Sequence, residues 1–282
     1  LVAIPMFIFM GTMLEKSGVA KDLLYALQIL LRSVPGGLAL SVTIMGTIMA
    51  ATTGIIGASV VMMTLLALPV MLERKYDKSL STGTIAASGT LGILIPPSIM
   101  LVIMADLLAI SVGTLFVASV FPGLLLAVLY FIYLLLRTRF NPKLAPPLPD
   151  SIGPDNSKDK IKLIFKSFLP PIFLILLVLG SIFAGFATPT EAAGVGALGS
   201  ILLAILNKRL NYSVMKEVTE RSALTGAMIF GIFVGATAFS YVFRSLGGDD
   251  LIHHFVNEIG FGPWGILFIM MGLVFLLGFF FD

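Results

Sequence analysis

The stretch Ser88-Gly89-Thr90-Leu91-Gly92-Ile93-Leu94-Ile95-Pro96-Pro97-Ser98 places two consecutive prolines inside an apolar run. Proline lacks a backbone N–H and clashes with the preceding helical turn, so this pair predicts a broken helix. The freed carbonyls and the hydroxyls of the same stretch are hard oxygen ligands that suit a small alkali cation. The half-helix after Pro97 directs its N-terminus at the break, which favours an anion. The stretch therefore predicts a cation site beside a carboxylate site, with a packing kink as an equal alternative.

The composition places this broken helix in a membrane. Of the 282 residues 58% are hydrophobic and 12% are charged, whereas soluble chains carry about 25% charged residues. This balance excludes a soluble fold and disorder. Cysteine is absent, and the two histidines, His253 and His254, are adjacent, so no transition-metal site is expected. No catalytic or nucleotide-binding motif is present, so we expect no enzyme and no organic cofactor. The net charge of +3 does not indicate a nucleic-acid partner.

Several apolar runs approach the length of about 20 residues that a helix needs to cross a bilayer. These runs are 1–14, 36–72, 82–112, 115–136, 168–186, 191–206, 223–243 and 264–281. Basic residues gather in 73–78, 137–166 and 207–221, and the positive-inside rule assigns all three segments to the cytoplasmic side. The sequence thus predicts an all-α polytopic membrane protein.

The run 36–72 contains no charged residue, and basic residues flank both of its ends. Its middle, from Thr52 to Ser59, is rich in small and hydroxyl residues. Irregular backbone is tolerated at membrane depth only where protein or a water-filled cavity surrounds it. We therefore expect a re-entrant hairpin with its tip near Thr53-Gly54, rather than two thin spans. Thr52, Thr53 and Gly54 form a second candidate cation site, and close helix packing of small residues is the alternative explanation.

The end of the chain resembles its beginning at a shift of 228 residues. Pro35-Gly36-Gly37-Leu38 falls on Pro263-Trp264-Gly265-Ile266, and Gly54 falls on Asp282. Paired interrupted segments are typical of secondary transporters built from repeats. We therefore expect an inverted repeat, with Asp282 at a second hairpin tip as a further candidate cation ligand.

Other residues are expected to have structural roles. Pro35 and Gly37 precede an apolar helix, and Thr188-Pro189-Thr190-Glu191 has the pattern of a helix start, with proline in the first turn and an acid near the positive dipole end. A functional intramembrane acid is the alternative for Glu191.

The expected organisation is a scaffold helix with an amphipathic arm (1–33), a first repeat (34–136, with hairpin 34–72, broken helix 79–112 and helix 113–136), a cytoplasmic loop (137–166), second-repeat scaffold helices and arm (167–260), and the start of a second hairpin (261–282).

These motifs resemble the large membrane subunit of a TRAP transporter (tripartite ATP-independent periplasmic transporter). The stretches that carry the resemblance are Pro5–Gly11, Pro35–Ala39, Gly89–Ser98, Phe121–Leu124, Thr188–Ala193 and Gly278–Asp282. They cover almost the whole chain in order. The chain begins without methionine and ends within an apolar run, so we expect a fragment of a longer protein.

The resemblance implies an elevator-type, inverted-repeat secondary transporter in the bacterial inner membrane. It implies sodium coupling, a small membrane subunit and a periplasmic substrate-binding protein as partners, and organic acids such as C4-dicarboxylates as substrates. The candidate sodium ligands are Thr52, Thr53, Gly54, Ser88, Gly89, Thr90 and Asp282, and the candidate substrate-binding residues are Pro96, Pro97 and Ser98.

Many members of that family carry Ser-Gly-Ser-Ser at the first tip, where this chain has Thr53-Gly54-Ile55-Ile56. A sodium site there would depend more on backbone carbonyls and on Thr53.

Two alternatives to a TRAP permease are a stand-alone sodium–dicarboxylate symporter of a related elevator family and a non-transporting membrane scaffold subunit.

Overall fold

The computed structural model describes residues 2–53, 56–147, 153 and 156–280. Within these ranges the chain forms α-helices and one 3₁₀ turn, which confirms the all-α prediction. The elements are α1 (Ala3–Lys16), α2 (Val19–Leu30), α3 (Gly37–Thr53), α4 (Ile56–Glu73), α5 (Lys78–Leu94), α6 (Ile99–Leu107), α7 (Val112–Phe140), η1 (Pro142–Leu144), α8 (Ser157–Phe183), α9 (Pro189–Leu206), α10 (Tyr212–Ser245), α11 (Gly248–Ile259) and α12 (Pro263–Leu277).

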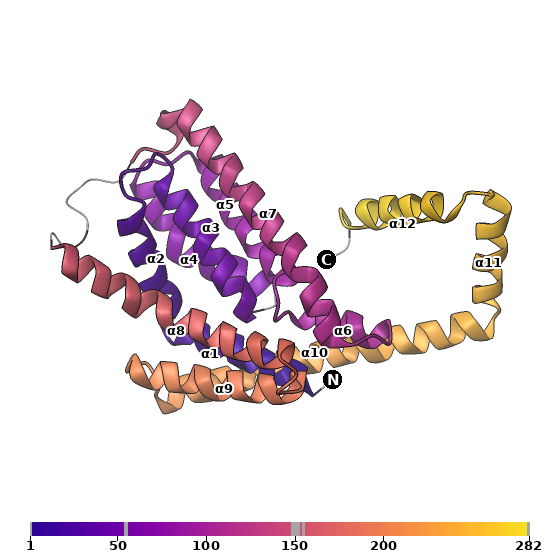
Figure 1. Ribbon diagram of the computed structural model, residues 1–282. Coiled ribbons are helices and arrows are strands. Elements are labelled where there is room, and N and C mark those ends of the chain that lie inside the picture. Colours follow the sequence, from indigo (N-terminus) through magenta and orange to yellow (C-terminus); the bar gives the residue numbers. More distant parts are fainter. Residues whose placement is uncertain (1, 54–55, 148–152, 154–155, 281–282) are drawn as a thin grey trace. The chain divides into compact units, whose positions relative to one another are not determined.

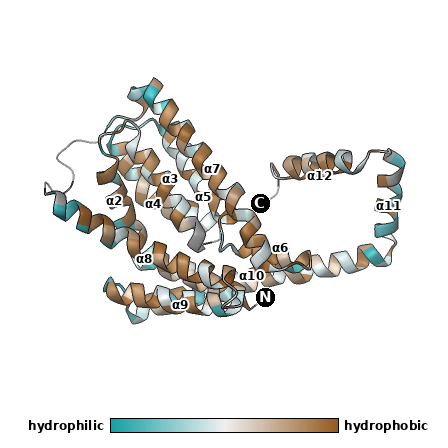
Figure 2. Ribbon diagram, in the orientation of Figure 1, coloured by the Kyte–Doolittle hydropathy of each residue, from teal (hydrophilic) through white to brown (hydrophobic). Residues whose placement is uncertain are grey.

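Four of the described helices are long and apolar enough to cross a membrane, namely α7, α8, α9 and α10. The pair α5 and α6 would make a fifth span if it is counted as one bent helix. Figure 2 shows α7 hydrophobic over most of its length, with hydrophilic residues near its C-terminal end and at the start of α8. The chain is therefore a multi-pass membrane protein.

The chain divides into two compact units, Leu1–Gly226 and Ala227–Asp282. In the first unit α1 packs along α9, and α9 also packs along α8. The hairpin helices α3 and α4 both pack on α5, and α7 lies beside α3 and α5 (Figure 1). Met13, Ala204 and Val218 form a buried apolar cluster that joins α1, α9 and the start of α10.

The base of the α3–α4 hairpin is held together by hydrogen bonds between distant segments. The backbone N–H of Leu38, at the start of α3, donates to the hydroxyl of Tyr76, just after α4, at 3.2 Å. The backbone N–H of Asp77 donates to the carbonyl of Leu144 at 2.8 Å. The Thr138 hydroxyl donates to the Pro35 carbonyl at 2.9 Å. Both ends of the hairpin therefore meet at one level, beside the basic residues that the positive-inside rule assigns to the cytoplasm.

The helix boundaries differ from the expected ones mainly in the segment 137–166. That segment is not all loop, because α7 continues to Phe140 and α8 begins at Ser157. The side chain of Asn156 caps α8 by accepting from the backbone N–H of Lys158 at 3.2 Å. Lys158, Lys162 and Lys166 recur at helical spacing on one side of α8, so the basic segment extends the span as a helix. The broken helix occupies 78–107 and the next helix 112–140, in place of 79–112 and 113–136.

The second unit repeats the order of elements at the start of the chain. The helix α2 follows Gly18, which is left-handed at φ 79°, and α11 follows Gly247 at φ 81°. Both helices contain 12 residues, and each is followed by an apolar helix, α3 or α12. Glycine is needed at these two turns because a side chain strains the left-handed backbone.

Candidate broken-helix site

The helix breaks at the tandem proline. The helix α5 ends at Leu94, Ile95 is extended at φ −90° and ψ 120°, and α6 begins at Ile99. The two helix axes differ by 42°. Both prolines are buried, and the peptide bond between them is cis. The last backbone N–H before the break, that of Ile95, donates to the Leu91 carbonyl at 3.0 Å. Because proline has no N–H, the next two carbonyls along α5 have no helical donor.

Ser98 lies at the start of α6 with its side chain fully buried. Its backbone is extended, as at a helix N-cap, yet its hydroxyl makes no capping hydrogen bond. Among the described residues the Oγ atom of Ser98 has no hydrogen-bond partner at all. A buried polar atom without a partner costs about 1–3 kcal/mol, and such atoms are often explained by a ligand or ion. Ser98 therefore offers an oxygen to a bound species at the break.

The hairpin helices α3 and α4 pack closely against α5 at two glycines. A Cβ atom added at Gly46 of α3 would lie 2.7 Å from the Cβ of Ser88, and one added at Gly89 would overlap the side chain of Val60 in α4. The Ser88 hydroxyl donates to the Thr43 hydroxyl of α3 at 3.4 Å. Ser88 and Gly89 thus lie where both hairpin helices contact the broken helix. For Gly89 this is a packing role, because the absence of a side chain admits Val60.

The register of these contacts places the end of α3 level with the break. The helices α3 and α5 both start at the hairpin base, and Gly46 meets Ser88 about ten residues into each helix. Seven residues after Gly46, α3 ends at Thr53. Seven residues after Ser88, the break begins at Ile95. At 1.5 Å per residue both lie roughly 10 Å beyond the contact. The end of the hairpin helix and the helix break therefore share one depth.

The remaining predicted ligands do not all join this site. Thr90 is exposed, and its hydroxyl donates to the Ala87 carbonyl of its own helix at 2.8 Å. Thr52 and Thr53 belong to the last turn of α3. Gly54 and Asp282 lie outside the described residues. The structure thus places Ser88 and Gly89 against the hairpin and the Pro96–Ser98 segment just beyond the end of the same helix, and it places Thr90 on a different face of α5.

The residues expected to have structural roles lie at helix starts. A Cβ atom at Gly37 would overlap the Leu31 carbonyl, so the chain passes too closely there for a side chain. At α9 the side chain of Thr188 accepts from the Glu191 N–H at 3.3 Å, and Glu191 accepts from the Thr188 N–H at 2.8 Å. This is a capping box with Pro189 in the first turn. These bonds account for Glu191 as a helix-start residue.

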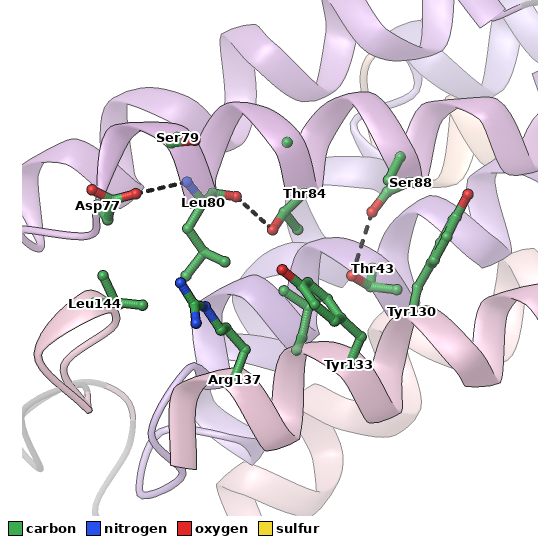
Figure 3. A pocket seen from close by; sticks show the side chains of 13 residues that line it. Thr43, Asp77, Ser79, Leu80, Thr84, Ser88, Tyr130, Tyr133, Arg137 and Leu144 are labelled. Atoms are coloured by element: carbon green, nitrogen blue, oxygen red, sulfur yellow. Dashed lines mark hydrogen bonds between the residues drawn. The ribbon is translucent and has the colours of Figure 1, made fainter. Parts of the chain in front are cut away.

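A polar cavity of about 340 Å³ extends from the hairpin base to Ser88 (Figure 3). Residues of α7 project toward α5 from one helical face, and the hydroxyls of α5 line the opposite wall. The polar groups that line the cavity are Thr43, Asp77, Ser79, Thr84, Ser88, Tyr130, Tyr133 and Arg137. Polar side chains at membrane depth are tolerated where they line a hydrated cavity. Thr43 and the two tyrosines could not be identified from the sequence, because helical spacing alone does not show which helix faces meet.

Among the described residues no three histidine, cysteine, aspartate or glutamate side chains come together in an arrangement that could hold a metal ion. The polar atoms at the break are hydroxyl and carbonyl oxygens, which carry no full charge. Such a set can hold a weakly bound alkali cation, whereas the N-terminus of α6 supplies backbone N–H groups to an anion.

The whole chain, residues 1–282, matches the family described as tripartite ATP-independent periplasmic transporter, DctM component. The C4-dicarboxylate TRAP transporter large permease protein DctM of Pseudomonas aeruginosa is 31% identical over 96% of this chain and 62% of its own length. The ectoine/5-hydroxyectoine TRAP transporter large permease protein UehC of Ruegeria pomeroyi is 29% identical, with coverage of 99% and 63%. The isethionate TRAP transporter permease protein DctMQ of Oleidesulfovibrio alaskensis is 31% identical, with coverage of 86% and 37%. The chain thus spans less than two thirds of the length of these relatives.

Proposed function

The chain belongs to the DctM family of tripartite ATP-independent periplasmic transporters, and on this premise we propose that the full-length protein carries a small organic anion into the cell together with sodium. As a large permease of this family the chain is a multi-pass protein of the bacterial inner membrane.

The single observation that carries the ion site is the buried, unpartnered hydroxyl of Ser98 beside the helix break. In the proposal sodium is bound by this hydroxyl and by carbonyls that the tandem proline leaves without donors. Thr53 and Asp282 remain predicted ligands from the two hairpin tips. The hydroxyl and carbonyl ligands at the break carry no full charge, so they hold the ion weakly enough for it to leave again, which a transport cycle requires.

The substrate class is inferred from α6, the helix that follows the break. The helix α6 begins at the break, and its first N–H groups and its dipole favour a negatively charged group. The relatives are named for C4-dicarboxylate, isethionate and ectoine, which share a carboxylate or a sulfonate group. We therefore assign this chain an organic anion with at least one such group.

The proposed partners are a periplasmic substrate-binding protein and a small membrane subunit, which the name of the DctMQ relative suggests is fused in that protein. In the proposed elevator cycle the hairpin and the broken helix, α3 to α6, move as one body against the layer of α1, α8 and α9. The two close glycine contacts on α5 support this, because they join the hairpin rigidly to the broken helix.

The test uses the full-length permease with its small subunit and its binding protein in proteoliposomes. Labelled succinate, isethionate and ectoine are offered under an inward sodium gradient, and then with equal sodium on both sides. We expect one of these compounds to accumulate only under the gradient. Vesicles without the binding protein are the control. Accumulation that is the same with and without the gradient would refute sodium coupling.

A further inference from the structure

A second cavity of about 340 Å³ lies away from the broken helix, between the α1–α2 turn, the end of α9 and α8. The Asn207 side chain closes one wall by donating to the Ser17 carbonyl at 3.1 Å. Three cationic side chains and a single carboxylate line the cavity, namely Lys166, Lys208, Arg209 and Asp22. The cavity therefore carries a net positive charge.

The cationic side chains of this cavity have no ion-pair partner among the described residues. Among the described residues none of Lys166, Lys208 and Arg209 has a carboxylate oxygen within 4.0 Å, although Asp22 shares the cavity with them. By contrast, Lys16 at the end of α1 pairs with Glu217 at 2.6 Å. The protein thus neutralises Lys16 but leaves three positive charges facing one concave surface.

The backbone of Lys208 has the conformation that ends a helix. Lys208 follows the end of α9 in the left-handed conformation, at φ 53°. The N–H of Arg209 donates to the Ala204 carbonyl at 2.9 Å and completes the helix end. Glycine or asparagine is the usual residue at such a position. Lys208 occupies this position and lines the cavity.

The cavity borders the end of a membrane-spanning helix. The membrane-spanning helix α9 ends at Leu206, which lines the cavity and is 75% exposed. On α8 the last lysine before the apolar run is Lys166, and Lys158 and Lys162 continue the same helical side away from the membrane. A basic pocket between helix ends on the cytoplasmic side, with an apolar residue at its edge, matches the headgroup and the first acyl carbons of a lipid.

We propose that this cavity binds the phosphate headgroup of an anionic phospholipid from the cytoplasmic leaflet. Lys166, Lys208 and Arg209 contact the phosphate, and Leu206 contacts the acyl chain. A free phosphate ion offers the same charge, but it has no acyl chain to contact Leu206. The site is independent of the transport proposal, so a failed sodium experiment would leave it unaffected.

The test titrates the purified full-length permease with phosphatidylglycerol or phosphatidylcholine and counts bound lipids by native mass spectrometry. We expect the wild-type protein to bind phosphatidylglycerol more tightly. The variant Lys166→Gln/Lys208→Gln should lose affinity for phosphatidylglycerol on the order of tenfold, because each cation near an anionic headgroup contributes to binding. Lys158→Gln/Lys162→Gln is the matched control, since it removes the same number of charges from α8, the helix that carries Lys166, but outside the cavity.

Two results would overturn the proposal. One is equal loss of phosphatidylglycerol in the cavity variant and in the control variant, which would show that only the overall positive charge matters. The other is displacement of phosphatidylglycerol by inorganic phosphate at similar concentration, which would identify a free-anion site. Both double variants change exposed lysines, and a circular dichroism melt of each variant verifies that it is folded.

Discussion

Ser98 sits at the start of α6 with its side chain fully buried, and its Oγ has no hydrogen-bond partner among the described residues. The neighbouring hydroxyls differ from it, because Ser88 contacts Thr43 and Thr90 donates to its own helix. At the residue scale the proposed ion site therefore depends most on Ser98. Removing a buried hydroxyl that has no protein partner should stabilise the ion-free protein. Removing a hydroxyl that makes a structural hydrogen bond should destabilise it.

Ser98→Ala should raise the stability of the ion-free protein by up to about 1 kcal/mol, because it removes a buried polar atom that has no partner. The same change should weaken the stabilisation by sodium and raise the sodium concentration for half-maximal uptake about tenfold, a loss of about 1.4 kcal/mol. Thermal unfolding in detergent with and without sodium measures the first effect, and a sodium titration of uptake measures the second.

Ser41→Ala is the matched control for Ser98→Ala. Ser41 is equally buried, but its hydroxyl donates to the Gly37 carbonyl at 2.7 Å. The control should leave the sodium titration unchanged. If Ser98→Ala destabilised the ion-free protein and left the sodium titration at its wild-type position, Ser98 would be a structural residue and the ion site would lie elsewhere.

At the scale of elements, the hairpin and the broken helix are joined by close contacts that a single methyl group would separate. Gly46→Ala places a Cβ atom 2.7 Å from the Cβ of Ser88, so α3 has to shift away from α5. We expect a loss of about 1–3 kcal/mol, as for other overpacked cores, and a lower midpoint of thermal unfolding.

Gly83→Ala, in α5 itself, controls for the effect of alanine on helix stability. Nothing lies within 4 Å of a Cβ atom added at Gly83, and alanine is a better helix former than glycine by about 1 kcal/mol. This variant should be as stable as the wild type or more stable. Equal unfolding midpoints for the Gly46 and Gly83 variants would contradict the close approach of α3 to α5.

The hairpin base depends on Tyr76, whose hydroxyl accepts from the Leu38 N–H. Tyr76→Phe leaves that buried donor without a partner, so we expect a loss of about 1–3 kcal/mol. Burial raises the pKa of Tyr76 from 10.0 to about 12. The unfolded tyrosine therefore ionises first, and its ionisation favours the unfolded state as the pH rises from about 10 to about 12.

Thermal unfolding of the wild type and of Tyr76→Phe across this pH range tests the assignment. Below pH 10 the wild type should unfold at the higher temperature, and its advantage should shrink as the pH approaches 12. An advantage that stays constant to pH 12 would show that the Tyr76 hydroxyl is not buried at the hairpin base.

The helix break shows how far an element can be predicted from its residues. Pro96-Pro97 breaks the helix as predicted, yet Pro170-Pro171 lies inside α8 without ending it. The proline pair alone therefore does not decide the outcome. At the first pair, Gly123 of α7 packs against Leu94 and Ile95, where an added Cβ atom would lie 3.0 Å from the Ile95 side chain. Such packing supports the extended backbone, and it is not visible in the local sequence.

At the scale of the whole molecule, composition and the long apolar runs were enough to predict a polytopic helical protein, whereas the placement of the basic segments on one side stays a prediction. The apolar runs are long and the basic residues are clustered, so these signals do not depend on tertiary contacts. The bonds that join distant segments do depend on them. Thr43 and Ser88 are 45 residues apart, Pro35 and Thr138 are 103 apart, and Ser17 and Asn207 are 190 apart. No local pattern marks these pairs, so the cavities that Thr43 and Ser88 and that Ser17 and Asn207 border could not be predicted.

The central claim is that sodium crosses the membrane with the substrate through a site at the helix break. The most direct test is the flux of labelled sodium into proteoliposomes that hold the full-length permease and its partners, measured with and without substrate. We expect substrate entry to bring sodium with it in a constant ratio, and we expect Ser98→Ala to lower the coupled flux. Substrate entry with no accompanying sodium would contradict it.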